Sequence, residues 1–88
     1  MFDLPPAQYD HPFDGPLTVV SRPVEQIGLM CRTAGGFLAK DWALGATYGC
    51  SFKVNGRCYV IVPSDVPDQL RDQLFRHEQA HCNGWSHK

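Results

Sequence analysis

The dipeptide Asn55-Gly56 separates two segments whose composition is that of β-strands. Asn-Gly between two such segments is the strongest short-range signal for a β-hairpin with a type I′ turn, because both turn residues must adopt positive φ angles. The segment after the turn is apolar from Cys58 to Val62, which is typical of a central strand covered on both faces. We therefore predict a hairpin of Tyr48–Val54 and Arg57–Val62, with the second strand inside a sheet.

Three further elements accompany this hairpin. The β-branched run Leu17–Ser21 predicts a strand, and Pro23 is typical of the first turn of a helix that ends near Gly35-Gly36. After Pro63, leucines and histidines recur at steps of four, three and four, which predicts an amphipathic helix that ends at Asn83-Gly84. Residues 32–47 mix three glycines with large apolar side chains and give no clear assignment. The sequence thus predicts an α+β domain in the order strand, helix, hairpin, helix, with a three-stranded sheet packed on the C-terminal helix.

The length of 88 residues allows one domain. Residues 1–16 hold four of the seven prolines and predict an extended arm, so that residues 17–88 form the domain. The net charge is −1 without a basic stripe, which argues against a nucleic-acid partner. No apolar run reaches the roughly 18 residues that a membrane span needs, and the N-terminus lacks the apolar segment of a signal peptide. We therefore expect a cytoplasmic protein without a membrane or nucleic-acid partner.

The four cysteines are Cys31, Cys50, Cys58 and Cys82. Their spacing includes no CxxC pair, which argues against a four-cysteine zinc site. Three disulfide pairings are possible, and without a secretory signal the simplest expectation is buried, reduced thiols. In the predicted hairpin register, Cys50 lies opposite Ile61 and Lys53 lies opposite Cys58. Because strand side chains alternate, Cys50 and Cys58 are then expected on opposite faces of the sheet.

Residues 77–87 read HEQAHCNGWSH and contain the pattern HExxHxxGxxH. Two histidines four residues apart on a helix, His77 and His81, present both imidazoles to one point, as a tetrahedral zinc requires. Glu78 is rotated by about 100° from His77, where it can accept a proton from a zinc-bound water and pass it to a leaving amine. Gly84 lets the helix stop and the chain turn back. His87 can then supply a third ligand and leave the fourth position open, as in catalytic zinc sites.

This segment resembles the zinc-binding signature of the zincin metallopeptidases, in the metzincin form with three histidine ligands. It is also similar to small uncharacterised bacterial and phage proteins that end in an HExxHCNGW-type sequence. The resemblance covers residues 77–87. It implies a minimal zincin-like domain that uses Zn2+ to hydrolyse a peptide or protein substrate, with His77, His81 and His87 as ligands and Glu78 as the catalytic residue. It also implies that an edge strand, here Tyr48–Val54, binds the substrate in an extended form.

Some groups expected near such a centre have no clear counterpart in the sequence. Metzincins have a methionine turn after the third histidine, whereas this sequence ends at Lys88. The candidates to replace the tyrosine ligand or oxyanion donor of longer metzincin domains are Tyr48, Tyr59 and Trp85, with core packing as the alternative. Ligand imidazoles usually donate their other ring N–H to an oxygen, and the candidate partners are Asp14, Asp41 and Asp65.

Two other functions stay open. In the first, the chain is a catalytically inactive zincin-like binding module with a structural zinc and a protein partner. In the second, it is a zinc-free interaction domain whose histidines are incidental. The proline-rich arm is expected to be flexible or packed on the surface, and an alternative is that it folds over the motif and brings His11 to the metal. The sequence leaves the oligomeric state open.

Overall fold

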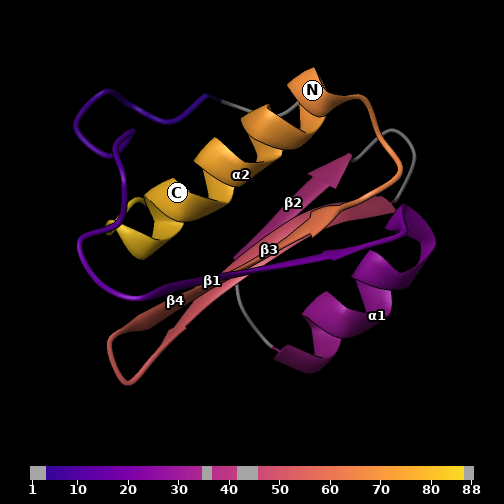
Figure 1. The fold of residues 1–88 in the computed structure, drawn as a ribbon, viewed down its shortest axis with the longest axis horizontal. Helices are drawn as coiled ribbons and strands as arrows, with labels where there is room; N and C mark the ends of the chain where they lie inside the picture. The colour runs from indigo at the N-terminus through magenta and orange to yellow at the C-terminus, as the bar shows by residue number, and fades with distance from the viewer. Residues whose placement is uncertain (1–3, 35–36, 42–45, 87–88) are drawn as a thin grey trace.

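The computed structural model describes residues 4–34, 37–41 and 46–86, and the side chains of residues 4–33 and 47–86. Within these residues the chain forms β1 (Leu17–Arg22), α1 (Val24–Ala34), β2 (Phe37–Asp41), β3 (Ala46–Val54), β4 (Arg57–Pro63) and α2 (Asp68–Cys82). The strands form one sheet in the order β1-β4-β3-β2, in which β1 and β4 are parallel and the other neighbours are antiparallel. The two helices lie on opposite faces of the sheet (Figure 1). The predicted α+β class is confirmed, and β2 adds a fourth strand to the three that were predicted.

The hairpin of β3 and β4 has the predicted turn and register. Asn55 and Gly56 adopt φ angles of 52° and 81°, the left-handed values that a type I′ turn requires. Lys53 pairs with Cys58, and Cys50 pairs with Ile61. The turn chemistry therefore sets the register of the two strands at the centre of the sheet.

The prediction that Tyr48–Val54 forms an edge strand is wrong. β3 lies between β4 and β2, and Phe37 to Asp41 of β2 pair with Ser51 to Ala46 of β3. β2 is the edge on this side, and β1 is the edge on the other. The glycine-containing segment that became β2 has no two-residue period, so its pairing has no local signal. The prediction that Arg57–Val62 lies inside the sheet is confirmed.

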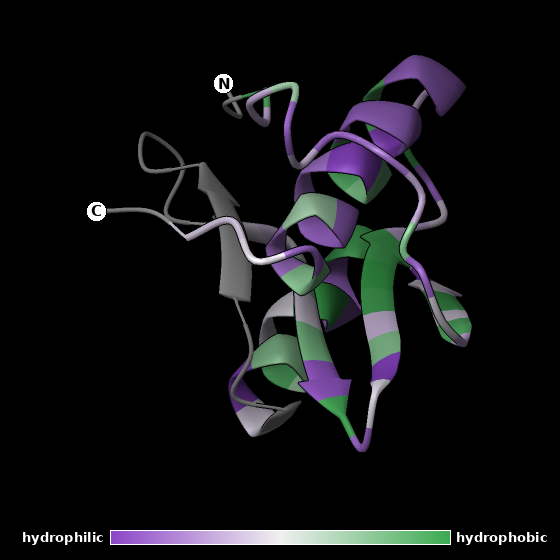
Figure 2. Ribbon diagram, turned by 90° about the vertical axis from the view of Figure 1, so that its left-hand side faces the viewer, coloured by the Kyte–Doolittle hydropathy of each residue, from purple (hydrophilic) through white to green (hydrophobic). Residues whose placement is uncertain are grey.

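Two apolar cores lie on the two faces of the sheet. Because successive side chains of a strand point to opposite faces, β4 contributes to both, and it is largely hydrophobic in Figure 2. The core under α2 contains Cys58, Val60, Val62, Leu74 and Cys82. The core under α1 contains Ile27, Cys31, Cys50 and Ile61. Neither helix in the described part of the chain combines the length and the hydrophobicity that crossing a membrane requires.

All four cysteines form disulfides, so the expectation of reduced thiols is wrong. Cys50 and Cys58 point to opposite faces, as the hairpin register predicted, and each is bonded to the helix on its own face. Cys31 of α1 is bonded to Cys50 of β3, and Cys82 of α2 is bonded to Cys58 of β4. The partners are 19 and 24 residues apart in sequence, so the pairing follows from the layered fold and not from local spacing. Each disulfide attaches one helix to the sheet.

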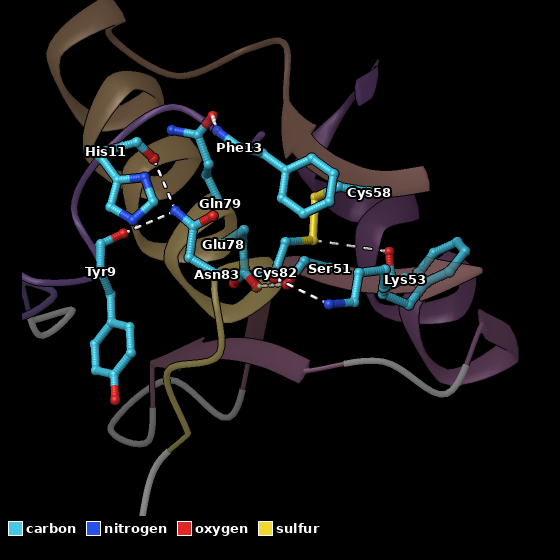
Figure 3. Close-up of a disulfide and its surroundings, with 11 residues drawn as sticks. Tyr9, His11, Phe13, Ser51, Lys53, Cys58, Glu78, Gln79, Cys82 and Asn83 are labelled. Atoms are coloured by element: carbon cyan, nitrogen blue, oxygen red, sulfur yellow. Dashed lines mark hydrogen bonds between the residues drawn. A yellow bond between two sulfur atoms is a disulfide. The ribbon is translucent and has the colours of Figure 1, made fainter. Parts of the chain in front are cut away.

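The N-terminal arm packs along α2. Asp10 forms an ion pair with Arg76, and the Phe13 N–H donates to the Gln79 side-chain oxygen at 3.1 Å. The Asn83 amide donates to the carbonyls of residues 9 and 11 at 2.9 and 2.8 Å (Figure 3). Arg76 and Gln79 of α2, together with the C-cap residue Asn83, form a stripe about 140° around the helix from His77 and His81. The arm is therefore packed on the surface, and it does not bring His11 over the motif histidines.

Replacing Cys58 and Cys82 together by alanine is expected to lower the free energy of unfolding by about 3 kcal/mol. A cross-link across a loop of 24 residues restricts the unfolded chain by roughly that amount. Urea unfolding followed by circular dichroism measures the difference, and the Cys31→Ala/Cys50→Ala variant is the matched comparison for α1. An unchanged unfolding midpoint in the Cys58→Ala/Cys82→Ala variant would contradict the attachment of α2 by this bond.

Candidate metal centre

The two helical histidines of the motif lie side by side on α2. His77 and His81 are one turn apart, and their ring centroids are 4.9 Å apart with an interplanar angle of 76°. The two residues are only 3% and 5% exposed. The face that carries them continues the apolar face of α2 that contains Leu74, as the periodicity predicted. The spacing of the motif thus brings two imidazoles together in a water-excluded place.

The chain turns back over the histidines directly after α2. The Gly84 N–H donates to the His81 carbonyl, and the Trp85 N–H donates to the Ala80 carbonyl, both at 3.1 Å. These two bonds, with Gly84 at a φ of 108°, are those of a Schellman motif, which favours glycine because the backbone is left-handed. The predicted helix stop at Asn83-Gly84 is therefore confirmed, and its geometry directs Trp85 back toward the helix.

Trp85 covers both imidazoles. Its ring stacks on His81 at 4.8 Å between centroids with an angle of 8°, and it meets His77 edge-on at 5.0 Å. Its backbone carbonyl lies 2.7 Å from Nδ1 of His81. A carbonyl oxygen can only accept, so Nδ1 is the donor, and in the neutral form of the ring Nε2 carries the lone pair.

This tautomer is the one that a metal ligand needs. Histidine ligands usually bind the metal through one ring nitrogen and donate the other N–H to an oxygen. The Trp85 carbonyl fills that role for His81, and Nε2 is shielded from solvent. Of the predicted partners, Asp65 instead accepts a hydrogen bond from the Val24 N–H at 2.8 Å and caps α1. The side chain of Asp41 lies outside the described residues.

The third predicted ligand, His87, lies outside the described residues. Among residues 4–34, 37–41 and 46–86, no group of three or more His, Cys, Asp or Glu side chains is arranged to hold a metal ion. The structure therefore brings together two of the three predicted ligands. The ring positions and the tautomer of His81 fit a zinc site to which one further ligand is added.

Glu78 points from α2 toward the sheet and is completely buried. Its Oε1 accepts a hydrogen bond from the Ser51 hydroxyl of β3 at 2.8 Å (Figure 3). Its Oε2 is buried and has no hydrogen-bond partner in the described part of the chain. Burial raises the pKa of Glu78 to about 8, and the Ser51 hydrogen bond opposes that rise. The catalytic candidate is thus held between the helix and β3.

A β-bulge shapes the strand beside Glu78. Ala39 of β2 pairs with Gly49, whereas Lys40 pairs with Thr47, so Tyr48 is an extra residue in β3. The bulge turns Tyr48 to the α2 face, where it packs against the core under that helix. At Gly49, a Cβ atom would lie 3.0 Å from the Ile61 carbonyl oxygen and 3.9 Å from Oε2 of Glu78. Glycine therefore allows the close approach to the Ile61 carbonyl oxygen, next to the buried carboxyl group.

The three aromatic candidates have different outcomes. Trp85 contacts both imidazoles, and Tyr48 lies on the same face of the sheet as α2. Tyr59 stacks on Phe52 at 5.0 Å, on the face covered by α1. Tyr59 is therefore separated from the histidines by the sheet.

Comparison with known proteins identifies no relative: no family model, no curated protein and no solved structure matches the chain.

Gly49→Ala is expected to lower the free energy of unfolding by about 1–3 kcal/mol, because its methyl group would lie only 3.0 Å from the Ile61 carbonyl oxygen of β4. Gly28→Ala is the matched control. Gly28 lies in α1, and the added methyl group would meet only the end of the Arg32 side chain at 3.4 Å. We expect this substitution to raise the free energy of unfolding by about 0.5–1 kcal/mol. Urea unfolding of both variants measures the sign of each change in the free energy of unfolding. A Gly49→Ala protein as stable as wild type would contradict the close approach of Gly49 to the β4 backbone.

Proposed function

We propose that the protein is a zinc-dependent hydrolase of peptide bonds, in which His77, His81 and His87 hold the metal and Glu78 is the catalytic base. The observation that carries the proposal is the pair of buried imidazoles one turn apart on α2, one of which donates Nδ1–H to the Trp85 carbonyl. Zinc is the metal that tetrahedral sites rich in imidazole usually bind. His87 is included because its position completes the HExxHxxGxxH pattern.

The proposed chemistry divides between the metal and Glu78. A bound zinc ion supplies a Lewis acid that polarises a carbonyl oxygen and lowers the pKa of water. Glu78 accepts the proton of the attacking water and delivers it to the nitrogen of the leaving amine. The Glu78 side chain is completely buried, so bulk water is excluded from this proton transfer.

The same burial favours a second candidate function, an inactive zincin-like module with a structural zinc and a protein partner. A catalytic zinc keeps one position open to water and substrate, whereas a structural zinc is closed. With His77 and His81 at most 5% exposed, a closed site is consistent with the geometry of the described residues. In that case the face beside α2 would serve a protein partner, and Glu78 would have no chemical step.

The compartment is a separate proposal. The N-terminal sequence predicts the cytoplasm, where thiols are generally kept reduced. The pairing of all four cysteines instead favours an oxidising compartment. We therefore propose that the protein works where its disulfides persist.

Glu78→Gln is expected to retain about one zinc per chain and to lose hydrolysis. Glutamine keeps the size of the side chain and an oxygen that can accept from Ser51, but it cannot take a proton from water. Metal content by mass spectrometry and cleavage of a pool of quenched fluorogenic peptides are measured on the same preparations.

Glu25→Gln, which changes the exposed glutamate of α1, is the matched control and is expected to keep wild-type cleavage. Cleavage by the Glu78→Gln protein would contradict the mechanism. A wild-type protein that holds one zinc and cleaves none of the peptides would favour the structural-zinc module.

A further inference from the structure

We propose that Ser51 is a positioning residue that holds one carboxyl oxygen of Glu78 on β3 and leaves the other oxygen to transfer the proton. This inference rests on the proposed hydrolase function. It goes beyond the HExxH pattern, because Ser51 lies 27 residues before Glu78 and outside the motif.

The contact between the two side chains is direct and enclosed. Ser51 and Glu78 are both fully buried, and the hydroxyl donates to Oε1 at 2.8 Å. Ser51 pairs with Val60 in the sheet, and Val60 belongs to the apolar core under α2. A hydroxyl and a carboxyl in such a place each cost free energy unless they bond to each other. Apolar side chains of similar size would fill the space more favourably, so core packing alone does not account for the pair.

The two oxygens of Glu78 have different surroundings. Oε1 is occupied by Ser51, whereas Oε2 has no hydrogen-bond partner in the described part of the chain. Gly49 precedes Ser51 by two residues and lies on the same face of β3, where a Cβ atom would lie 3.9 Å from Oε2. One strand thus supplies the hydrogen bond that fixes the first oxygen, and its glycine places no side chain against the second.

Fixing one oxygen has a consequence for proton transfer. A general base must lie within hydrogen-bond reach of the proton that it removes, and the terminal torsion of glutamate is broad in the absence of a partner. The Ser51 hydrogen bond, with α2 tied to β4 by the Cys58–Cys82 disulfide, restricts that rotation. The effect of Ser51 is therefore expected in the rate of the chemical step and not in substrate binding.

The test compares substitutions of Ser51 that differ in the hydroxyl. Ser51→Ala is expected to keep zinc, to leave KM within about twofold, and to lower kcat by at least tenfold. Ser51→Thr and Ser51→Val have the same shape, and only threonine keeps the hydroxyl. We expect Ser51→Thr to retain at least fivefold more kcat than Ser51→Val. Ser64→Ala, at an exposed serine, is the control and is expected to match wild type.

A second readout does not depend on activity. In the zinc-free protein, the infrared bands of the Glu78 carboxyl group, identified by their loss in Glu78→Gln, are expected to shift in Ser51→Ala and Ser51→Val but not in Ser51→Thr. Loss of a hydrogen bond to the carboxyl oxygen causes this shift. A band that stays in place would overturn the contact.

The kinetic outcomes separate the two proposals. If wild type cleaves peptides, Glu78→Gln does not, and Ser51→Ala and Ser51→Val keep wild-type kcat, the role of Ser51 is overturned and the hydrolase function stands. If Glu78→Gln keeps wild-type cleavage, the proposed function fails and the role of Ser51 fails with it.

Discussion

The C-terminal end of α2 is attached to the rest of the molecule by a covalent bond and by polar contacts. The Cys58–Cys82 disulfide joins it to β4, and the Lys53 ammonium donates to the Cys82 carbonyl at 3.3 Å (Figure 3). The Schellman motif uses two more of the carbonyls that a helix end leaves without partners. Helix ends usually fray, but this one carries both imidazoles and Glu78 in its last two turns. Their mutual positions depend on this attachment.

The polar groups between α2 and the sheet lower the stability of the folded domain. Apolar side chains in the same place would raise it. Glu78 is fully buried with a pKa raised to about 8, and one of its oxygens has no partner in the described residues. Such groups are uncommon in cores and are concentrated at functional sites. The disulfides and the docked arm offset this cost by holding both helices and residues 9–13 against the sheet and α2. The contacts around the site, and not the polar groups within it, thus stabilise this part of the fold.

Local signals predicted the parts of the structure that depend on neighbouring residues. The Asn55-Gly56 turn set the hairpin register, and the spacing of His77 and His81 placed both rings on one helix face. β2 was missed because its short, glycine-flanked segment has no period. The α1 cap by Asp65 joins residues 41 apart, so no local pattern indicates it.

Only the part of the candidate site that depends on neighbouring residues could be predicted from the sequence. Its helical half follows from the motif, whereas the Ser51–Glu78 contact depends on which strand the helix covers. The acceptor for His81 is a backbone carbonyl, and a carbonyl is present at every residue and so carries no sequence signal. A serine at an inward-facing position of β3 is the one feature of the sequence that would have indicated a polar partner under α2.

The central claim is that the motif histidines, and not the cysteines, bind zinc. X-ray absorption fine structure of the zinc-loaded, oxidised protein tests it most directly. The account predicts only nitrogen and oxygen neighbours at about 2.0–2.1 Å with the outer-shell scattering of imidazole rings, and loss of that signal in His81→Ala. Sulfur neighbours at about 2.3 Å, or no stoichiometric zinc, would contradict it.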